Sequence, residues 1–196
     1  LALRAIEQIP PTRIRHISRI LYHWRSIPGS VAYSAEQKEY AHERARQAIR
    51  EHLQRQGIQA EVTEAPGNLH RVKYSLPTPA PTVSLMILAS RPTGQFRSMI
   101  EDVLEHTEYA AIELCVIVPV GLADIDKEIA AAFTSDPRVV LLRVAANTVA
   151  AAYNEAAERA HGSILCFLSG ATRIVSPDWL REMVSHAIRP GIGPVG

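Results

Sequence analysis

The chain has 196 residues, of which 47% are hydrophobic and 21% are charged, and its formal net charge is +1 at pH 7. This composition is ordinary for a globular protein, and a charge so close to zero points to no partner through bulk electrostatics. No apolar run approaches the ~20 residues needed to cross a bilayer, so we expect no transmembrane segment.

Charge is unevenly distributed along the chain. Residues 1–60 carry ten Lys or Arg against five Asp or Glu, whereas residues 82–196 carry nine against thirteen. This contrast favours two structural units. Because the sequence begins at Leu1 and stops at a Gly-Pro-Val-Gly, we expect it to be a piece of a longer protein.

Residues 1–30 form a tail segment that contains the basic and aromatic stretch "RIRHISRILYHWRSIPGS" (13–30). Its arginines could bind phosphates while Tyr22 and Trp24 stack on bases. Alternatively, the segment docks on a neighbouring domain, with the arginine stems lying over apolar surface. Because the net charge is balanced, we favour docking and expect no nucleic-acid partner.

Residues 31–76 predict a helix followed by a hairpin. Ser34 and Gln37 have the spacing of a capping box, Gly57 suits the end of a helix, and apolar residues recur at helical spacing between them. "IQAEVTEA" and "NLHRVKYSL" flank a Pro-Gly-Asn turn and predict the hairpin. The three prolines of "PTPAPT" (77–82) then predict an extended linker, where we place the main domain boundary.

The remainder, 83–196, alternates between predicted strands and predicted helices. Apolar runs predict strands over 83–89, 112–118, 138–144 and 163–169, and amphipathic stretches predict helices over 96–107, 124–135, 148–160 and 176–188. Ser176 is expected to cap the last helix, with Pro177 at its first position. This alternation predicts an α/β fold, a mostly parallel sheet with helices on both faces.

Cys115 and Cys166 each lie within an apolar run. Buried thiols in a chain of this size indicate reduced core residues in a reducing compartment. A disulfide between them is the less favoured alternative, since it requires their strands to be neighbours. Together with the absence of a signal-peptide pattern, the free thiols predict a cytoplasmic location.

Several stretches, in this order, resemble the nucleotide-binding half of a family 2 glycosyltransferase: "VSLMILASRP", "IELCVIVPVG", "DPRVVLLR", "YNEAAERAHGSILCFLS" and "SPDWLREMVSHAIRPGIGPVG". The resemblance covers residues 82–196 and implies a GT-A fold, which is Rossmann-like. The earlier stretch "RIRHISRILYHWRSIPGSVA" resembles the closing segment of a catalytic domain of the same family. His23 would then either face the active site of that preceding domain or pack in an interface.

The resemblance also implies a set of nucleotide-binding candidates. Ala89, Ser90 and Arg91 occupy the turn after the first strand, and Val118 stands where the family has an acid after the second. Asn154 matches a family asparagine. Ser169, Gly170 and Ala171 occupy the turn that in the family carries an Asp pair, and Arg173 follows it.

The family's Asp pair holds Mg²⁺ or Mn²⁺ against the donor diphosphate. Gly170 and Ala171 offer no side-chain ligand, and Asp178 belongs to a helix start. We therefore expect no catalytic residue, no metal ion and no cofactor in this chain. Arg173 could supply a replacement charge for a nucleotide sugar, the alternative being a solvated arginine.

The resemblance implies transfer of a sugar from a nucleotide-sugar donor to a glycan or lipid-linked acceptor in polysaccharide biosynthesis. Because the acids are missing, we expect this chain to be inactive by itself and to depend on an upstream glycosyltransferase domain. The alternative is a non-catalytic scaffold, or a module that binds glycan or a partner.

Overall fold

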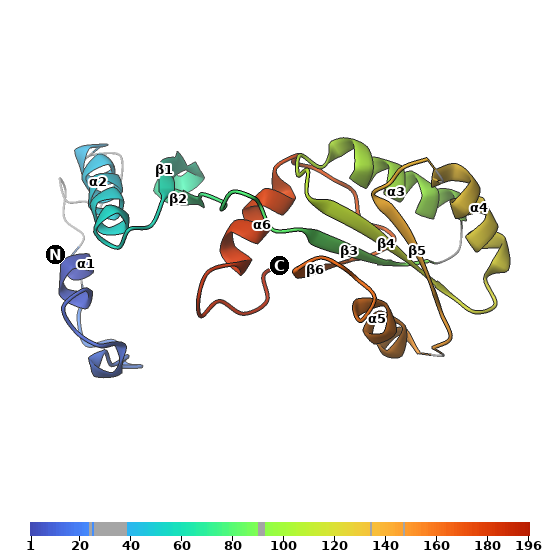
Figure 1. The fold of residues 1–196 in the computed structure, drawn as a ribbon. Helices are drawn as coiled ribbons and strands as arrows, with labels where there is room; N and C mark the ends of the chain where they lie inside the picture. Colours follow the sequence, from blue (N-terminus) through green and yellow to red (C-terminus); the bar gives the residue numbers. More distant parts are fainter. Residues whose placement is uncertain (24, 26–38, 90–92, 134, 147) are drawn as a thin grey trace. The chain divides into compact units, whose positions relative to one another are not determined.

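A computed structural model describes residues 1–23, 25, 39–89, 93–133, 135–146 and 148–196. The chain divides into two compact units, Leu1–Ser75 and Leu76–Gly196 (Figure 1). The predicted capping pair Ser34 and Gln37 lies outside the described residues, as do the candidate site residues Ser90 and Arg91.

Unit 1 contains the predicted helix and hairpin. Its elements are α1 (Ala2–Ile6), the 3₁₀ turn η1 (Pro11–Arg13), α2 (Glu39–Arg55), β1 (Ala60–Ala65), the 3₁₀ turn η3 (Pro66–Asn68) and β2 (Leu69–Tyr74). Gly57 ends α2 with a positive φ of 66°, and the N–H of Ile58 returns to the carbonyl of Leu53 at 2.9 Å. A glycine adopts this conformation without steric cost, which is why the helix stops there.

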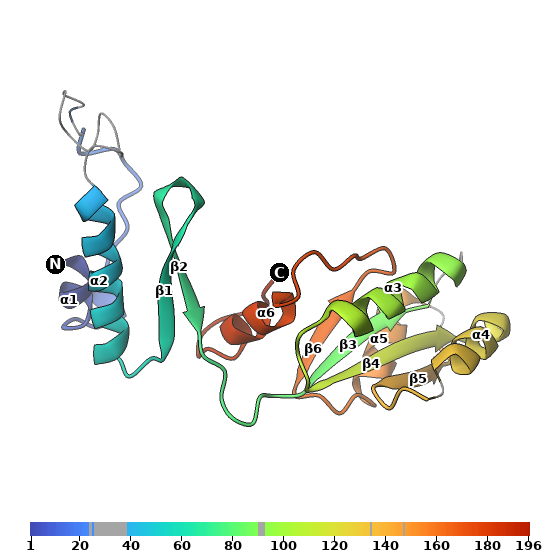
Figure 2. The ribbon, with the colours of Figure 1, turned by 90° about the horizontal axis from the view of Figure 1, so that it is seen from above.

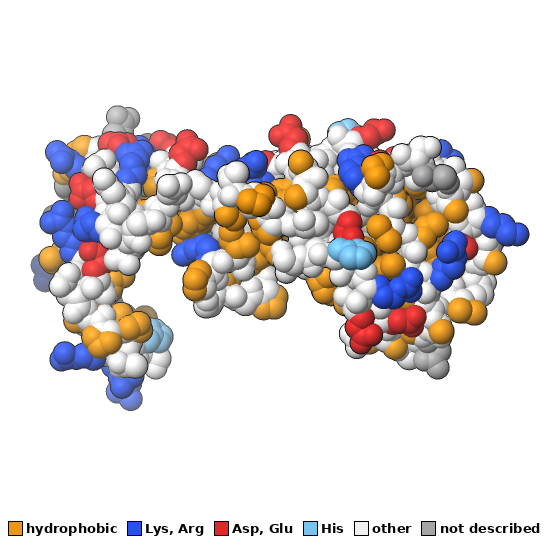
Figure 3. Space-filling view, in the orientation of Figure 1, with side chains coloured by type: hydrophobic (Ala, Val, Ile, Leu, Met, Phe, Trp, Pro, Cys, Tyr) orange, Lys and Arg blue, Asp and Glu red, His pale blue; other side chains and the backbone are white. Residues whose placement is uncertain are grey.

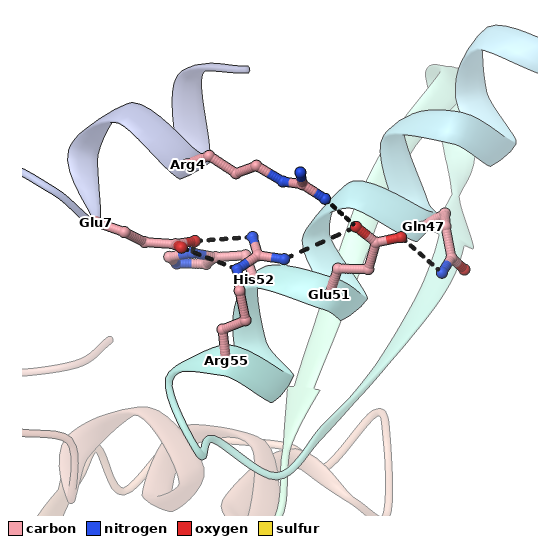
Figure 4. Close-up of polar contacts among 6 residues, drawn as sticks. All are labelled: Arg4, Glu7, Gln47, Glu51, His52 and Arg55. Atoms are coloured by element: carbon pink, nitrogen blue, oxygen red, sulfur yellow. Dashed lines mark hydrogen bonds and ion pairs between the residues drawn. The ribbon is translucent and has the colours of Figure 1, made fainter.

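Polar contacts hold α1 against α2 (Figure 4). The carboxylate of Glu7 accepts two bonds from the guanidinium of Arg55, each 2.9 Å long, and contacts Nδ1 of His52 at 2.6 Å. Hydrogen bonds from Arg55 and then His52 lower the pKa of Glu7 to about 2. Arg4 contacts Glu51 at 3.2 Å from the same side.

Two further arginines of α2 are also paired with carboxylates. Arg46 contacts Glu43 at 3.0 Å and Glu64 of β1 at 3.3 Å, and Arg50 contacts Glu43 at 2.9 Å. Acidic and basic side chains accordingly interleave over unit 1 in the space-filling view (Figure 3). In the extended segment before α2, by contrast, the large apolar side chains of Ile20 and Tyr22 are about four-fifths exposed.

Unit 2 is built on a four-stranded sheet in the order β5-β4-β3-β6, with every neighbouring pair parallel. The strands are β3 (Val83–Leu88), β4 (Ile112–Pro119), β5 (Val139–Val144) and β6 (Ile164–Leu168). The α/β class and the parallel sheet predicted from the sequence are confirmed. β3 and β4 form from continuous apolar runs because both of their faces are covered, whereas Leu165 and Phe167 of β6 are exposed.

Four helices pack on this sheet: α3 (Thr93–His106), α4 (Ala123–Phe133), α5 (Val149–Ala157) and α6 (Trp179–Ala187). Leu85 and Leu114 share one buried core with α3, α4 and α6, whereas Met86 and Ile117 share a second core with α5. Figures 1 and 2 show α3 and α4 on the opposite side of the sheet from α5. The alternation of side chains along each strand separates the two cores.

Cys115 and Cys166 are free, and they belong to the two different cores. β3 lies between their strands, so the less favoured disulfide alternative is excluded. Burial raises the pKa of the Cys115 thiol to about 12 and that of Cys166 to about 11. Both thiols are therefore protonated core groups at neutral pH.

The predicted cap of the last helix is wrong. α6 begins at Trp179, after Asp178 at the N-cap position, and not at Pro177. The hydroxyl of Ser176 donates to the carboxylate of Asp178 at 2.9 Å instead of accepting from a helix N–H. Pro177 lies before the helix, and its carbonyl accepts a hydrogen bond from the N–H of Glu108 at 2.9 Å.

Among the helices of the described ranges, none is both long enough and apolar enough to span a membrane.

Candidate functional site

The order of the strands creates a crevice in unit 2. From β3 the chain adds β4 and β5 on one side, and then crosses over to place β6 on the other side of β3. The order of the strands therefore reverses between β3 and β6, and the connections from their carboxyl ends lead to α3 and to the segment before α6. In open α/β sheets this is the position at which ligands bind.

A cleft of about 390 Å³ lies beside this edge, between α3 and the turn after β6. One wall consists of Gln95, Ser98, Met99 and Asp102 of α3, and the other is the segment Gly170–Arg173. Gln95, Ser98 and Asp102 share one face of α3 because their spacing of three and four residues follows the helical repeat. The cleft is thus lined by an amide, hydroxyl groups, a carboxylate and a guanidinium.

The turn after β6 is held by its own polar groups. The hydroxyl of Ser169 accepts from the N–H of Ala171 at 3.3 Å, and the carbonyl of Ser169 accepts from the N–H of Thr172 at 3.0 Å. This arrangement closes a tight turn in which the serine side chain serves the backbone. An acceptor lone pair of Ser169 is therefore already in use.

Asp102 brings a carboxylate to this turn that sequence reasoning missed. Its Oδ2 accepts from the N–H of Ile174 at 2.7 Å, and its Oδ1 lies 3.1 Å from Nδ1 of His106. The side chain is 22% exposed, so these bonds form in a partly desolvated place. Asp102 consequently anchors the end of the turn to α3.

Three of the predicted site residues meet in this cleft: Gly170, Ala171 and Arg173. Arg173 is exposed and has no hydrogen bond or ion pair to any residue that the structure describes. Ser169 immediately precedes them at the end of β6. The cleft therefore combines the guanidinium of Arg173, which has no partner among the described residues, with a turn made of small residues.

Other predicted residues lie elsewhere. Ala89 is buried at the end of β3, and its N–H donates to the carbonyl of Ile117 at 2.8 Å. Val118 is only 3% exposed and its side chain belongs to the core beneath α3 and α4. Asn154 is exposed on α5, the helix on the opposite face of the sheet, and it does not line the cleft.

A second carboxylate, Asp126 of α4, lies at the carboxyl end of β4. It lines a small cavity of about 150 Å³ together with Val118–Ala123 and Arg143. Its Oδ2 accepts from Nε of Arg143 at 2.8 Å, and this hydrogen bond raises the pKa of Arg143. Its Oδ1 is buried and has no hydrogen-bond partner among the described residues. Val118 stands where the resembled family has an acid after the second strand. Asp126 brings a carboxylate to the same small cavity, but this carboxylate is already paired with Arg143.

The residues of the cleft do not fit Mg²⁺ or Mn²⁺. These ions take six or more oxygen ligands, usually including carboxylates, and Gly170 and Ala171 provide no side-chain oxygen. The Oδ2 of Asp102 is bonded to the N–H of Ile174. Across the described ranges, no three His, Cys, Asp or Glu side chains gather where they could hold one ion.

Two features could have identified Asp102 in advance. It is a polar residue of the amphipathic helix that follows a buried strand, and it lies on the same helix face as Gln95 and Ser98. Spacing alone, however, does not say that this face meets residues 170–174. The same holds for Asp126, whose partner Arg143 comes from β5.

The fold is that of a glycosyltransferase of the GT-A type. A mannosyltransferase from Pyrobaculum calidifontis, solved in complex with GDP-Man and Mn²⁺, superposes with a TM-score of 0.53 at 16% sequence identity. The match covers 81% of this chain and 44% of the mannosyltransferase chain. At this identity the likeness shows the fold alone.

Two relatives match nearly the whole chain in sequence. "Uncharacterized protein y4gI" of Sinorhizobium fredii is 35% identical over 99% of this chain, and the "O-antigen biosynthesis protein RfbC" of Myxococcus xanthus is 32% identical over 93%. The chain spans only 22% and 14% of their respective lengths. No family model matches the chain.

Proposed function

We propose that this chain is part of a glycosyltransferase-type protein that assembles a cell-surface polysaccharide. The protein would move a sugar from a nucleotide-sugar donor to a glycan or lipid-linked acceptor. Two findings support this proposal: the fold shared with a mannosyltransferase that binds GDP-Man, and the sequence likeness to an O-antigen biosynthesis protein. The buried, protonated thiols suit a cytoplasmic location, where such donors are available.

Within that protein, unit 2 provides a donor-domain fold that does not itself catalyse transfer. The observation that carries this proposal is the turn Ser169-Gly170-Ala171 at the carboxyl end of β6. A cation there would offset charge on the departing diphosphate, and the turn has no carboxylate to hold one. Catalysis would belong to an upstream glycosyltransferase domain of the same protein, which unit 2 positions as a scaffold.

Arg173 is the residue we assign to any remaining contact with a donor diphosphate. An uncommitted guanidinium at the edge of a polar cleft offers five N–H donors, and phosphate oxygens match that geometry. Ser98 and Thr172 would add neutral donors from the two walls of the cleft. Asp102 also lines the cleft, but its Oδ2 accepts from the N–H of Ile174 and its Oδ1 lies beside the ring of His106.

The first experiment is a calorimetric titration of the chain with UDP, GDP and dTDP sugars, with and without Mn²⁺. We expect any binding to be independent of Mn²⁺ and to be lost in Arg173→Ala. Arg97→Ala is the matched control, because Arg97 lies on α3 but pairs with Glu101 at 2.9 Å. Tight binding that requires Mn²⁺ in the unmodified chain would contradict the proposal.

A gain-of-function variant tests the same point from the other side. Replacing Gly170 and Ala171 together with aspartate restores the two carboxylates of the resembled turn. We expect this double variant to acquire Mn²⁺-dependent binding of one of these nucleotide sugars, measured by the same titration. If the double variant folds, as judged by circular dichroism, and its binding still does not depend on Mn²⁺, then the lack of carboxylates does not explain why this turn binds no metal.

A further inference from the structure

Two histidine rings lie together inside unit 1. His42 is on α2 and His70 is on β2, and their ring centroids are 6.0 Å apart with the planes tilted by 58°. The β1–β2 register places His70 opposite Glu64, and α2 packs on β1. Figure 2 shows α2 alongside the hairpin. The pair therefore joins a helix to a sheet within one compact unit.

One nitrogen of each ring is buried without a partner. Nε2 of His42 and Nδ1 of His70 are both shielded from solvent, and neither has a hydrogen bond among the described residues. Buried polar atoms in folded proteins are nearly always bonded to protein, water or an ion. Two orphan imidazole nitrogens on adjacent rings therefore mark a place for a bound species.

The chemistry of the pair selects a metal ion. Neutral imidazole nitrogen is the commonest protein ligand for transition metals and suits Zn²⁺, Ni²⁺ and Cu²⁺. With metal–nitrogen bonds of about 2.0–2.1 Å, two imidazoles on one ion have centroids about 5 Å apart at the tetrahedral angle and about 6 Å apart when the angle opens. The observed separation is 6.0 Å, which corresponds to the wider of these two arrangements.

The surrounding charges permit a cation. Arg46 lies one helical turn after His42, and its side chain is only 14% exposed. Its guanidinium is neutralised by Glu43 at 3.0 Å and by Glu64 at 3.3 Å. The carboxylate of Glu64, which stands opposite His70 in the hairpin, adds negative charge on this side of the unit. Arg50 also contacts Glu43, so these two arginines and two glutamates balance in charge and leave no net positive charge to repel a divalent ion.

We propose that His42 and His70 form a binding site for one divalent ion of the first-row transition metals, and that their side chains turn to admit the ion together with the waters that complete its coordination. The ion would tie α2 to β2 and so stiffen unit 1. The sequence did not reveal this site, because neither histidine belongs to a motif with the short spacing of known zinc sites. It is independent of the cleft in unit 2.

The test is a calorimetric titration of the 196-residue chain, without a histidine tag, using Zn²⁺ and Ni²⁺ in a buffer that does not chelate metal. We expect one ion per chain, and at least about tenfold weaker binding in both His42→Gln and His70→Gln. His16→Gln is the control, because His16 is exposed in the tail segment and its substitution should leave binding unchanged. Equal binding in all four proteins, or none at millimolar metal, would overturn the proposal.

A spectroscopic readout separates a lost ligand from a lost fold. In the electron paramagnetic resonance spectrum of the chain with one equivalent of Cu²⁺, we expect hyperfine coupling to two imidazole nitrogens. Each single variant should show one nitrogen fewer while retaining the circular dichroism of the parent. A spectrum that is identical in parent and variants would place the copper elsewhere and refute the site.

Discussion

The hydroxyl of Ser84 donates to the carboxylate of Glu113 at 2.5 Å, and this bond joins the second residue of β3 to the second residue of β4. The same carboxylate accepts from the N–H of His161 at 2.5 Å and from the N–H of Gly162 at 3.2 Å. Burial acts to raise the pKa of Glu113, but the hydrogen bonds from Ser84, His161 and Gly162 outweigh it and lower the pKa. One carboxylate thus fixes two strands and the turn that leads into β6.

Gly162 should not tolerate a side chain. A Cβ at this position would collide with the hydroxyl and backbone nitrogen of Ser84, which is completely buried. We expect Gly162→Ala to lower the free energy of unfolding by about 1–3 kcal/mol, as forced overpacking does. Urea denaturation measures the loss. Gly94→Ala is the control, since a Cβ at Gly94 meets nothing within 4 Å and should be neutral or slightly stabilising.

Removing the charge of Glu113 should cost stability in a pH-dependent way. At pH 7 we expect Glu113→Gln to destabilise unit 2 by about 1.5–3 kcal/mol, the range for hydrogen bonds to a charged group. Because the folded pKa is lowered, the stabilisation is present above the ordinary value of 4.5 and is lost as the pH falls through the folded pKa. Urea midpoints of parent and variant should therefore converge on acidification. A difference in urea midpoint between parent and variant that stays constant down to pH 2 would show that the charge of Glu113 is not the source of the stabilisation.

Glu7 should control the docking of α1 on α2 at acidic pH. Its folded pKa of about 2 lies below the ordinary 4.5, so its contribution is complete above 4.5 and disappears between 4.5 and about 2. Amide hydrogen exchange in α1 should be faster in Glu7→Gln than in the parent at pH 6. The two proteins should become indistinguishable near pH 2. Persistence of the difference at that pH would assign the effect of the substitution to packing.

Asp102 should determine the order of the turn after β6. We expect Asp102→Ala to destabilise unit 2 by about 1–2 kcal/mol, because the partly buried N–H of Ile174 loses its acceptor. Asp102→Asn keeps an oxygen at the same place and should lose less than half of that. Hydrogen exchange at Ile174 reports the local effect and urea denaturation the global one. Equal protection of Ile174 in all three proteins would show that the bond does not hold the turn.

The thiols should be inert in the native protein. Burial holds the pKa of Cys115 near 12 and that of Cys166 near 11, so the reactive thiolate is scarce at pH 8. We expect a disulfide reagent such as DTNB to label neither cysteine over minutes in buffer, and to label both at once in 6 M guanidinium. Rapid labelling of one thiol in buffer would show that its core opens readily.

The strands of unit 2 were predictable because each is a continuous apolar run bounded by turn residues. Val83–Leu88 and Ile112–Pro119 read as buried strands for that reason, and the sheet buries them. The bonds Asp102–Ile174, Asp126–Arg143 and Glu113–Ser84 were not predictable, because their partners lie 17 to 72 residues apart in the chain. Local patterns report periodicity, and these bonds depend on how helices and strands meet.

The start of α6 illustrates a different failure. "SPD" satisfies the local rules for a cap followed by a first-turn proline, and yet the helix begins two residues later. The carbonyl of Pro177 bonds to Glu108, and the indole N–H of Trp179 donates to the hydroxyl of Thr107 at 3.1 Å. Anchoring to the segment between α3 and β4 outweighs the local preference. Of the candidate site, Gly170, Ala171 and Arg173 were placed together by the resemblance alone.

The bonds around Glu113 lie at the amino edge of the sheet, while the turn after β6 lies at the carboxyl edge. The two edges are therefore free to change separately in evolution. Substitutions at residues 169–171 leave the bonds among Ser84, Glu113 and Gly162 untouched, so the residues of that turn can vary without loss of the sheet. The fold is held at one edge of the sheet, while the side chains that meet a ligand stand at the other.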